Sequence, residues 1–88
     1  MYIALITITL RKSILDPQGK AVHHAIESLQ MSLVEEVRIG KYIEMKINVD
    51  TQDEAKHITE EACKKILANP VMEDYTFSVE KISDVFAM

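Results

Sequence analysis

The stretch that decides the fold is Tyr-Ile-Ala-Leu-Ile-Thr-Ile-Thr-Leu, residues 2–10. Its even-numbered positions, from Tyr2 to Leu10, are all apolar, whereas its odd-numbered positions turn polar after Leu5. A period of two in a segment rich in β-branched residues is typical of a strand. We therefore expect the chain to begin with a strand whose even-numbered side chains lie in the core.

Two amphipathic helices are expected further along the chain. Asp16 is an N-cap before a proline that suits the first helical position, and apolar residues recur at helical spacing through 17–30. Thr51 and Glu54 form a capping box for the second helix, which the Asn69-Pro70 pair ends. The expected buried stripes are Ala21, Val22, Ala25, Ile26 and Leu29 in the first helix, and Ala55, Ile58, Ala62, Ile66 and Leu67 in the second.

The remaining segments have the pattern of strands. Leu33 to Val49 is predicted to be two strands that bend near Ile39–Lys41, where Gly40 is the only turn signal, and a last strand is expected near Tyr75–Ile82. The order is therefore β-α-β-β-α-β. This predicts an α+β two-layer sandwich, with a mostly antiparallel four-stranded sheet and both helices on one face.

The other face of this sheet is the expected place of self-association. It would leave apolar side chains uncovered, and such patches usually mark contacts. The sequence thus predicts an obligate oligomer through this face. The side chains concerned are Ile3, Leu5 and either Tyr42 or Phe86.

Size and composition exclude several classes of protein. The chain has 88 residues, a net charge of −4 and one cysteine, and it contains no linker-like stretch. We expect a single domain over 1–88, with a radius of gyration of roughly 12 Å if it is compact. An acidic chain is a poor nucleic-acid binder, and the apolar run at the N-terminus is too short to span a bilayer. A cytoplasmic protein, without a membrane or nucleic-acid partner, is expected.

No group of side chains has the spacing of a self-sufficient active site. His23 and His24 are adjacent, so they point apart on a helix, whereas two helical metal ligands sit three or four positions apart. Cys63 lies beside an apolar stripe and is expected to be a buried thiol. The sequence therefore predicts no catalytic residue, no bound metal and no cofactor, as in a binding or assembly module.

A basic turn is the one candidate contact site. Arg38 and Lys41 flank Gly40, and two cations around a bend could hold an anion or meet an acidic partner surface. The pattern also fits an ordinary soluble turn with charged edges. Both interpretations remain open on the residues alone.

Three segments resemble the PurS family, the small subunit of phosphoribosylformylglycinamidine synthase. They are Leu-Asp-Pro-Gln-Gly-Lys-Ala-Val (15–22), Val-Arg-Ile-Gly-Lys (37–41) and Cys-Lys-Lys-Ile-Leu-Ala-Asn-Pro-Val-Met-Glu-Asp-Tyr (63–75). Their order and spacing make the resemblance specific, and it extends over essentially the whole chain. One departure is Gln30, where the family's pattern has glycine.

The resemblance implies a role in the fourth step of de novo purine synthesis. A PurQ glutaminase releases ammonia, and a PurL synthetase uses ATP and magnesium to join it to formylglycinamide ribonucleotide. PurS is implied to be a dimer or tetramer that bridges the two and helps ammonia pass. The family's chemistry lies on the other subunits, so no catalytic residue is carried over.

The resemblance also directs attention to particular residues. Arg38 and Lys41, with Gly40 between them, are the expected contact residues. The start of the first helix is expected to be shaped by Asp16, Gln18 and Gly19. The turn after the second helix is expected to be fixed by Asn69, Pro70 and Asp74.

A regulatory small-molecule binder is the alternative. Sandwiches of this topology often bind amino acids between protomers. Stabilisation against heat by a free amino acid or nucleotide, without affinity for a synthetase, would favour this class.

Overall fold

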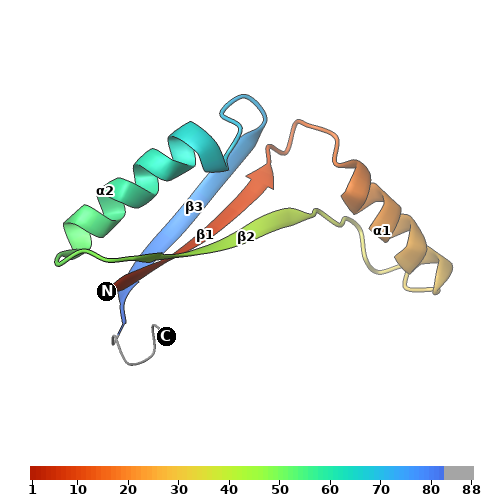
Figure 1. Ribbon diagram of the computed structural model, residues 1–88. Helices are drawn as coiled ribbons and strands as arrows, with labels where there is room; N and C mark the ends of the chain where they lie inside the picture. The colour runs from red at the N-terminus through yellow and green to blue at the C-terminus, as the bar shows by residue number, and fades with distance from the viewer. Residues whose placement is uncertain (83–88) are drawn as a thin grey trace.

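The computed structural model describes residues 1–82 and has the element order β-α-β-α-β (Figure 1). Phe86, which we named for the uncovered sheet face, lies outside the described residues. A short π-helical turn, η1, extends the second helix. The elements are β1 (Tyr2–Leu10), α1 (Pro17–Ser28), β2 (Gly40–Ile47), α2 (Gln52–Ala62), η1 (Cys63–Leu67) and β3 (Glu73–Lys81).

The opening strand is the centre of the structure. β1 pairs antiparallel with both neighbours, in the order β2-β1-β3, and Ile6 lies opposite Ile43 and Phe77. Tyr2, Ala4, Ile6 and Ile8 are buried, so the expected alternation is confirmed. α2 covers this apolar face and packs against β1 and β3.

The predicted fourth strand and the bend near Ile39–Lys41 are wrong. The sheet of residues 1–82 has three strands, and residues 33–39 form no strand. Gly40 instead begins β2 opposite Thr9, with a negative φ. A side-chain carbon at Gly40 would lie 2.6 Å from the carbonyl oxygen of Ile8. This glycine is therefore needed for the close approach of two strands and not for a turn.

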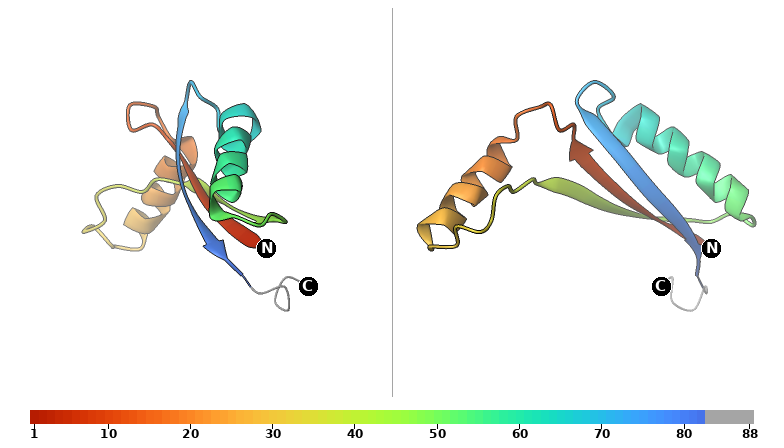
Figure 2. Two further views of the ribbon diagram at one scale, coloured as in Figure 1. Left: turned by 90° about the vertical axis from the view of Figure 1, so that its left-hand side faces the viewer. Right: turned by 180° about the vertical axis from the view of Figure 1, so that it is seen from behind.

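The prediction that both helices cover one sheet face is also wrong. α1 projects beyond the ends of β1 and β2, as the views from opposite sides in Figures 1 and 2 show. We call residues 12–39, which leave and rejoin the sheet at this end, the arm. The radius of gyration is 16.9 Å, well above that of a compact chain. The stripe of α1 is accordingly exposed in this chain, by 40% at Val22 and 69% at Leu29.

The second helix begins as expected but turns its stripe differently. Thr51 accepts a hydrogen bond from the Glu54 N–H at 3.2 Å, and Ala55, Thr59 and Cys63 are buried. Ile58 and Ile66 are exposed, contrary to our prediction. In η1 the Ala68 N–H donates to the carbonyl of Cys63, a step of five residues that changes the angular position of later side chains. Ile66, which regular α-helical spacing places with Thr59, is 82% exposed.

The end of α1 has the geometry of a glycine cap although it has no glycine. Gln30 has a φ of 66°, in the left-handed region that glycine adopts most easily. The N–H groups of Gln30 and Met31 donate to the carbonyls of Glu27 and Ile26, the two bonds of a Schellman motif. The departure at Gln30 therefore leaves the turn itself intact.

Candidate functional site

Asp16 joins the two chain segments at the base of the arm. It is 5% exposed and has the extended backbone expected of an N-cap. Its Oδ1 accepts the Gly19 N–H at 3.0 Å, and its Oδ2 accepts the Ile39 N–H at 2.7 Å. One carboxylate thus caps α1 and holds the segment that returns to the sheet. Gly19 allows this approach, because a side-chain carbon there would overlap the carbonyl oxygen of Val37.

The same contacts set the charge state of Asp16. The hydrogen bond from Ile39, then that from Gly19, and to a lesser extent the positive charge of Arg38, lower the pKa of this carboxyl below its ordinary value, against the opposing effect of burial. The carboxylate is therefore held ionised where the arm meets the sheet.

We expect Asp16→Asn to remove an acid-sensitive part of the stability. Asparagine keeps the helix cap but has an NH2 donor in place of one carboxylate oxygen, so the N–H groups of Gly19 and Ile39 no longer each meet an acceptor oxygen. Because the folded pKa of Asp16 lies below its unfolded value near 3.9, the stability that it contributes is complete above that value. It is lost as the pH falls through the folded pKa. Urea unfolding from pH 5 to pH 2 should show the two proteins converging, and parallel curves would contradict this account.

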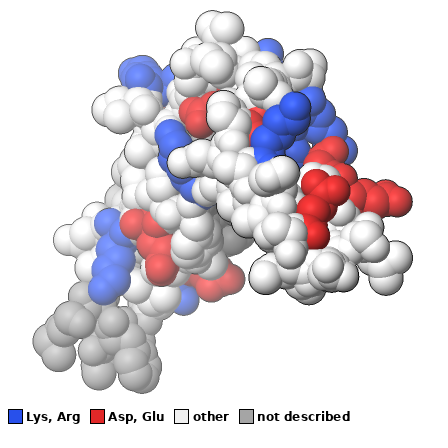
Figure 3. Space-filling model, turned by 90° about the vertical axis from the view of Figure 1, so that its right-hand side faces the viewer, with Lys and Arg blue, Asp and Glu red and all other residues white. Residues whose placement is uncertain are grey.

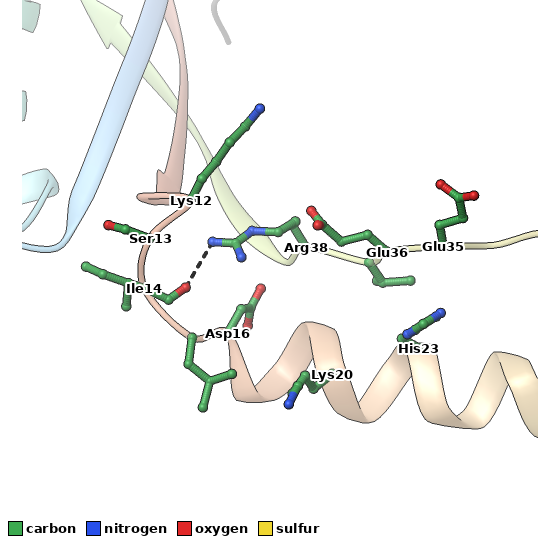
Figure 4. A pocket seen from close by; sticks show the side chains of 11 residues that line it. Lys12, Ser13, Ile14, Asp16, Lys20, His23, Glu35, Glu36 and Arg38 are labelled. Atoms are coloured by element: carbon green, nitrogen blue, oxygen red, sulfur yellow. Dashed lines mark hydrogen bonds between the residues drawn. The ribbon is translucent and has the colours of Figure 1, made fainter.

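Arg38 is the second residue that holds the base of the arm together. Its Nη2 lies 3.0–3.3 Å from three backbone carbonyls, those of Leu10, Arg11 and Ile14. In Figure 4 its side chain points toward Ile14, whereas Lys12 extends away from Asp16. Arg38, Ile14 and Lys12 line a hollow of about 410 Å³ between α1 and residues 35–38. The guanidinium that we named as a partner contact is thus engaged within the chain.

Three further candidate residues of the first two motifs lie around a second hollow that also borders Asp16. Gln18, Gly40 and Lys41 line a smaller hollow of about 170 Å³, with Asp16 at its edge. The Lys41 Nζ lies 3.5 Å from a carboxylate oxygen of Glu73, so this cation pairs with the start of β3. All six residues from the two motifs therefore gather at the arm base.

Residues of the third motif are joined to the arm base by Arg11, a residue that the motifs do not include. Its guanidinium donates to the carbonyl of Pro70 at 2.7 Å and to Asp74 at 3.3 Å. The Asn69 side chain accepts from the Val71 N–H, which shapes the turn before β3. The position of this arginine directly after the first strand is the sequence signal that could have identified it as a site residue. Arg11 connects this turn to Arg38, since its own carbonyl accepts from that residue.

The described residues were also searched for a reactive thiol, a metal cluster and a membrane span. Burial raises the pKa of the Cys63 thiol, which leaves a poor nucleophile. Residues 1–82 contain no cluster of three or more metal-ligating side chains. No helix in this part of the chain is long and apolar enough to cross a membrane. The site is therefore best described as a fixed junction that carries the arm.

The family model described as PurS, phosphoribosylformylglycinamidine (FGAM) synthase, matches residues 3–81. The chain belongs to the PurS family. PurS from Bacillus subtilis strain 168 is 44% identical over 82 residues, covering 93% of this chain and 96% of the relative. PurS from Methanocaldococcus jannaschii is 40% identical over 93% of this chain and 99% of the relative.

Solved PurS structures share the architecture. The B. subtilis PurS crystal structure has a TM-score of 0.82 over 92% of this chain and all of that chain. The M. jannaschii PurS structure has a TM-score of 0.85 over 94% of this chain and all of that one. A chain of the PurLQS structure from Thermotoga maritima, at 23% identity, shares the fold with a TM-score of 0.81 over 91% of this chain and 99% of that chain. Because these alignments span more than nine-tenths of the chain, the projecting arm belongs to the PurS fold.

Proposed function

We propose that this PurS-family chain is the non-catalytic small subunit of a phosphoribosylformylglycinamidine synthase. In this proposal it bridges a PurQ-like glutaminase and a PurL-like synthetase and assists the passage of ammonia between them. The observation that carries the proposal is the family match over residues 3–81, together with the identity of 44% to PurS from B. subtilis. The choice of partners is supported by the PurLQS structure from T. maritima, because one of its chains shares this fold.

The physical requirement for such a subunit follows from the chemistry of ammonia. Ammonia released into water at neutral pH is mostly protonated, and ammonium is not a nucleophile. Transfer between two active sites therefore has to be shielded from water by docked subunits. A chain with a fixed junction and exposed apolar surfaces suits this task.

The proposal assigns the reactive groups to other chains. ATP and magnesium would be bound by the synthetase, and this chain would bind no cofactor of its own. A cytoplasmic location together with the other two subunits is part of the proposal, as is a dimeric or tetrameric state.

Reconstitution with the PurL-like and PurQ-like proteins of the same source tests this function. We expect omission of this chain to abolish most of the glutamine-dependent formation of formylglycinamidine ribonucleotide. Activity with added ammonium salt is the control and should survive, because external ammonia does not need the bridge. An unchanged glutamine-dependent rate without the chain would overturn the proposal.

A further inference from the structure

The turn between η1 and β3, residues 69–73, is fixed by its own hydrogen bonds. The carbonyl of Asn69 accepts from the N–H groups of Met72 and Glu73, at 3.2 and 2.8 Å. The Asn69 side chain accepts from the Val71 N–H at 2.9 Å, and the Asn69 N–H donates to the Glu73 carboxylate at 2.8 Å. The shape of this turn is therefore set before any partner binds.

Arg11 also holds the turn against the end of β1. Its backbone N–H donates to the carbonyl of Met72 at 2.9 Å, and its guanidinium donates to the carbonyl of Pro70 and to Asp74. The turn is thus fastened from outside as well as from within. A segment that is already ordered loses little conformational entropy on binding, so more of the contact energy remains as affinity.

The same turn presents apolar side chains to solvent. Val71 is 74% exposed and Met72 is 41% exposed, and Pro70 before them is exposed as well. We call Pro70, Val71 and Met72 the tip. The hydrogen bonds of the tip use only backbone groups, so polar side chains at Val71 and Met72 would leave them intact. The geometry of the turn therefore does not explain why these two side chains are apolar.

The position of the tip indicates what kind of surface can cover it. Figure 1 shows the turn projecting beyond the end of β1 at the top of the molecule, and Figure 3 shows a largely uncharged surface at the same height. A projecting tip fits a hollow, whereas a two-fold contact between copies pairs one surface with itself. The two hollows at the arm base are lined by charged side chains, so they are not apolar sockets. These observations favour a different protein as the partner.

We propose that the tip inserts into an apolar pocket of a different protein, with Val71 as the anchor of the contact. A fixed apolar side chain in a well-packed pocket is the usual form of an energetically dominant interface residue. The inference rests on the proposed function, in which the pocket lies on one of the other two subunits. It assigns the chain a contact surface that is separate from Arg38 and Lys41.

Titration of the full chain into a mixture of the PurL-like and PurQ-like subunits of the same source tests the proposal. Val71→Asp would bring a carboxylate into the apolar pocket, so the dissociation constant of the complex should rise by roughly 100-fold. Val71→Ala removes only two methyl groups and should raise it by about 10-fold. Ser78→Asp is the matched control, because it adds the same charge at an exposed position of β3, and it should bind as the wild type does.

Three outcomes would overturn the role of the tip. One is a folded Val71→Asp chain that binds as tightly as the wild type, with circular dichroism as the check of folding. Another is equal weakening by Val71→Asp and Ser78→Asp. The third is a changed sedimentation of the Val71→Asp chain by itself, which would place the tip between copies of this chain.

The wild-type chain separates this inference from the proposed function. If its omission leaves the glutamine-dependent rate unchanged, the proposed function fails. If the wild-type chain is required but Val71→Asp replaces it with unchanged affinity, only the role of the tip is wrong.

Discussion

Arg38→Ala is expected to loosen the arm while the sheet stays intact. The substitution leaves the carbonyls of Leu10, Arg11 and Ile14 without their shared donor. Because the donor is charged and these bonds fix the arm base, the loss should cost about 2 kcal/mol of local stability. Amides of residues 12–39 should then exchange with solvent roughly 30-fold faster, while those of β1 and β3 keep their protection.

Lys12→Ala is the matched control for this experiment. Lys12 lines the same hollow and carries the same charge, but its side chain extends away from Asp16 in Figure 4. It should leave exchange in the arm unchanged. If Arg38→Ala and Lys12→Ala behave alike, or if exchange rises equally throughout the sheet, Arg38 does not fasten the arm.

Features fixed by near neighbours in the sequence were predictable. The alternation in residues 2–10 identified β1 and its buried side, because strand periodicity is a local property. The cap at Asp16 and the capping box at Thr51 were likewise local. The first hydrogen-bonded turns of both helices followed from these residues.

Features set by distant contacts were not predictable. The stripe of α1 indicates that one side is to be covered, but periodicity does not say which surface covers it. Residues 33–39 contain strand-forming side chains, yet β2 begins only at Gly40, where the chain meets β1. The exposure of Ile66 depends on the hydrogen bond in η1 that spans five residues, and no pattern of residues predicts this bond.

The candidate site divides in the same way. The motifs indicated Arg38 and Asp16 as residues with a role, but not the groups that they bind. Arg38 meets carbonyls 24 to 28 positions earlier, and Asp16 meets an N–H group 23 positions later. Such pairings arise only when the chain returns from α1. The contacts of Arg38 in this chain lie within the arm base, and its expected contact with a partner stays a prediction.

Gly19→Ala is expected to destabilise the chain, against the usual trend for helices. An alanine in place of glycine within a helix normally adds about 1 kcal/mol of stability. At Gly19, however, the new carbon would overlap the carbonyl oxygen of Val37 and approach Asp16 Oδ2 to 2.8 Å. Neither group can move freely, because the Val37 carbonyl is backbone and Asp16 is held by Gly19 and Ile39. Displacing them should cost up to about 3 kcal/mol, which outweighs the gain in helix propensity.

Gln18→Ala, one position earlier and exposed, is the control for Gly19→Ala. Urea unfolding should show a change within about 0.5 kcal/mol for this variant, since a surface side chain is lost without a clash. For Gly19→Ala the midpoint should fall, and the Ile39 amide should exchange faster as its bond to Asp16 is strained. A Gly19→Ala chain more stable than wild type would mean that α1 and Val37 separate easily. The arm base would then be a flexible joint and not a fixed junction.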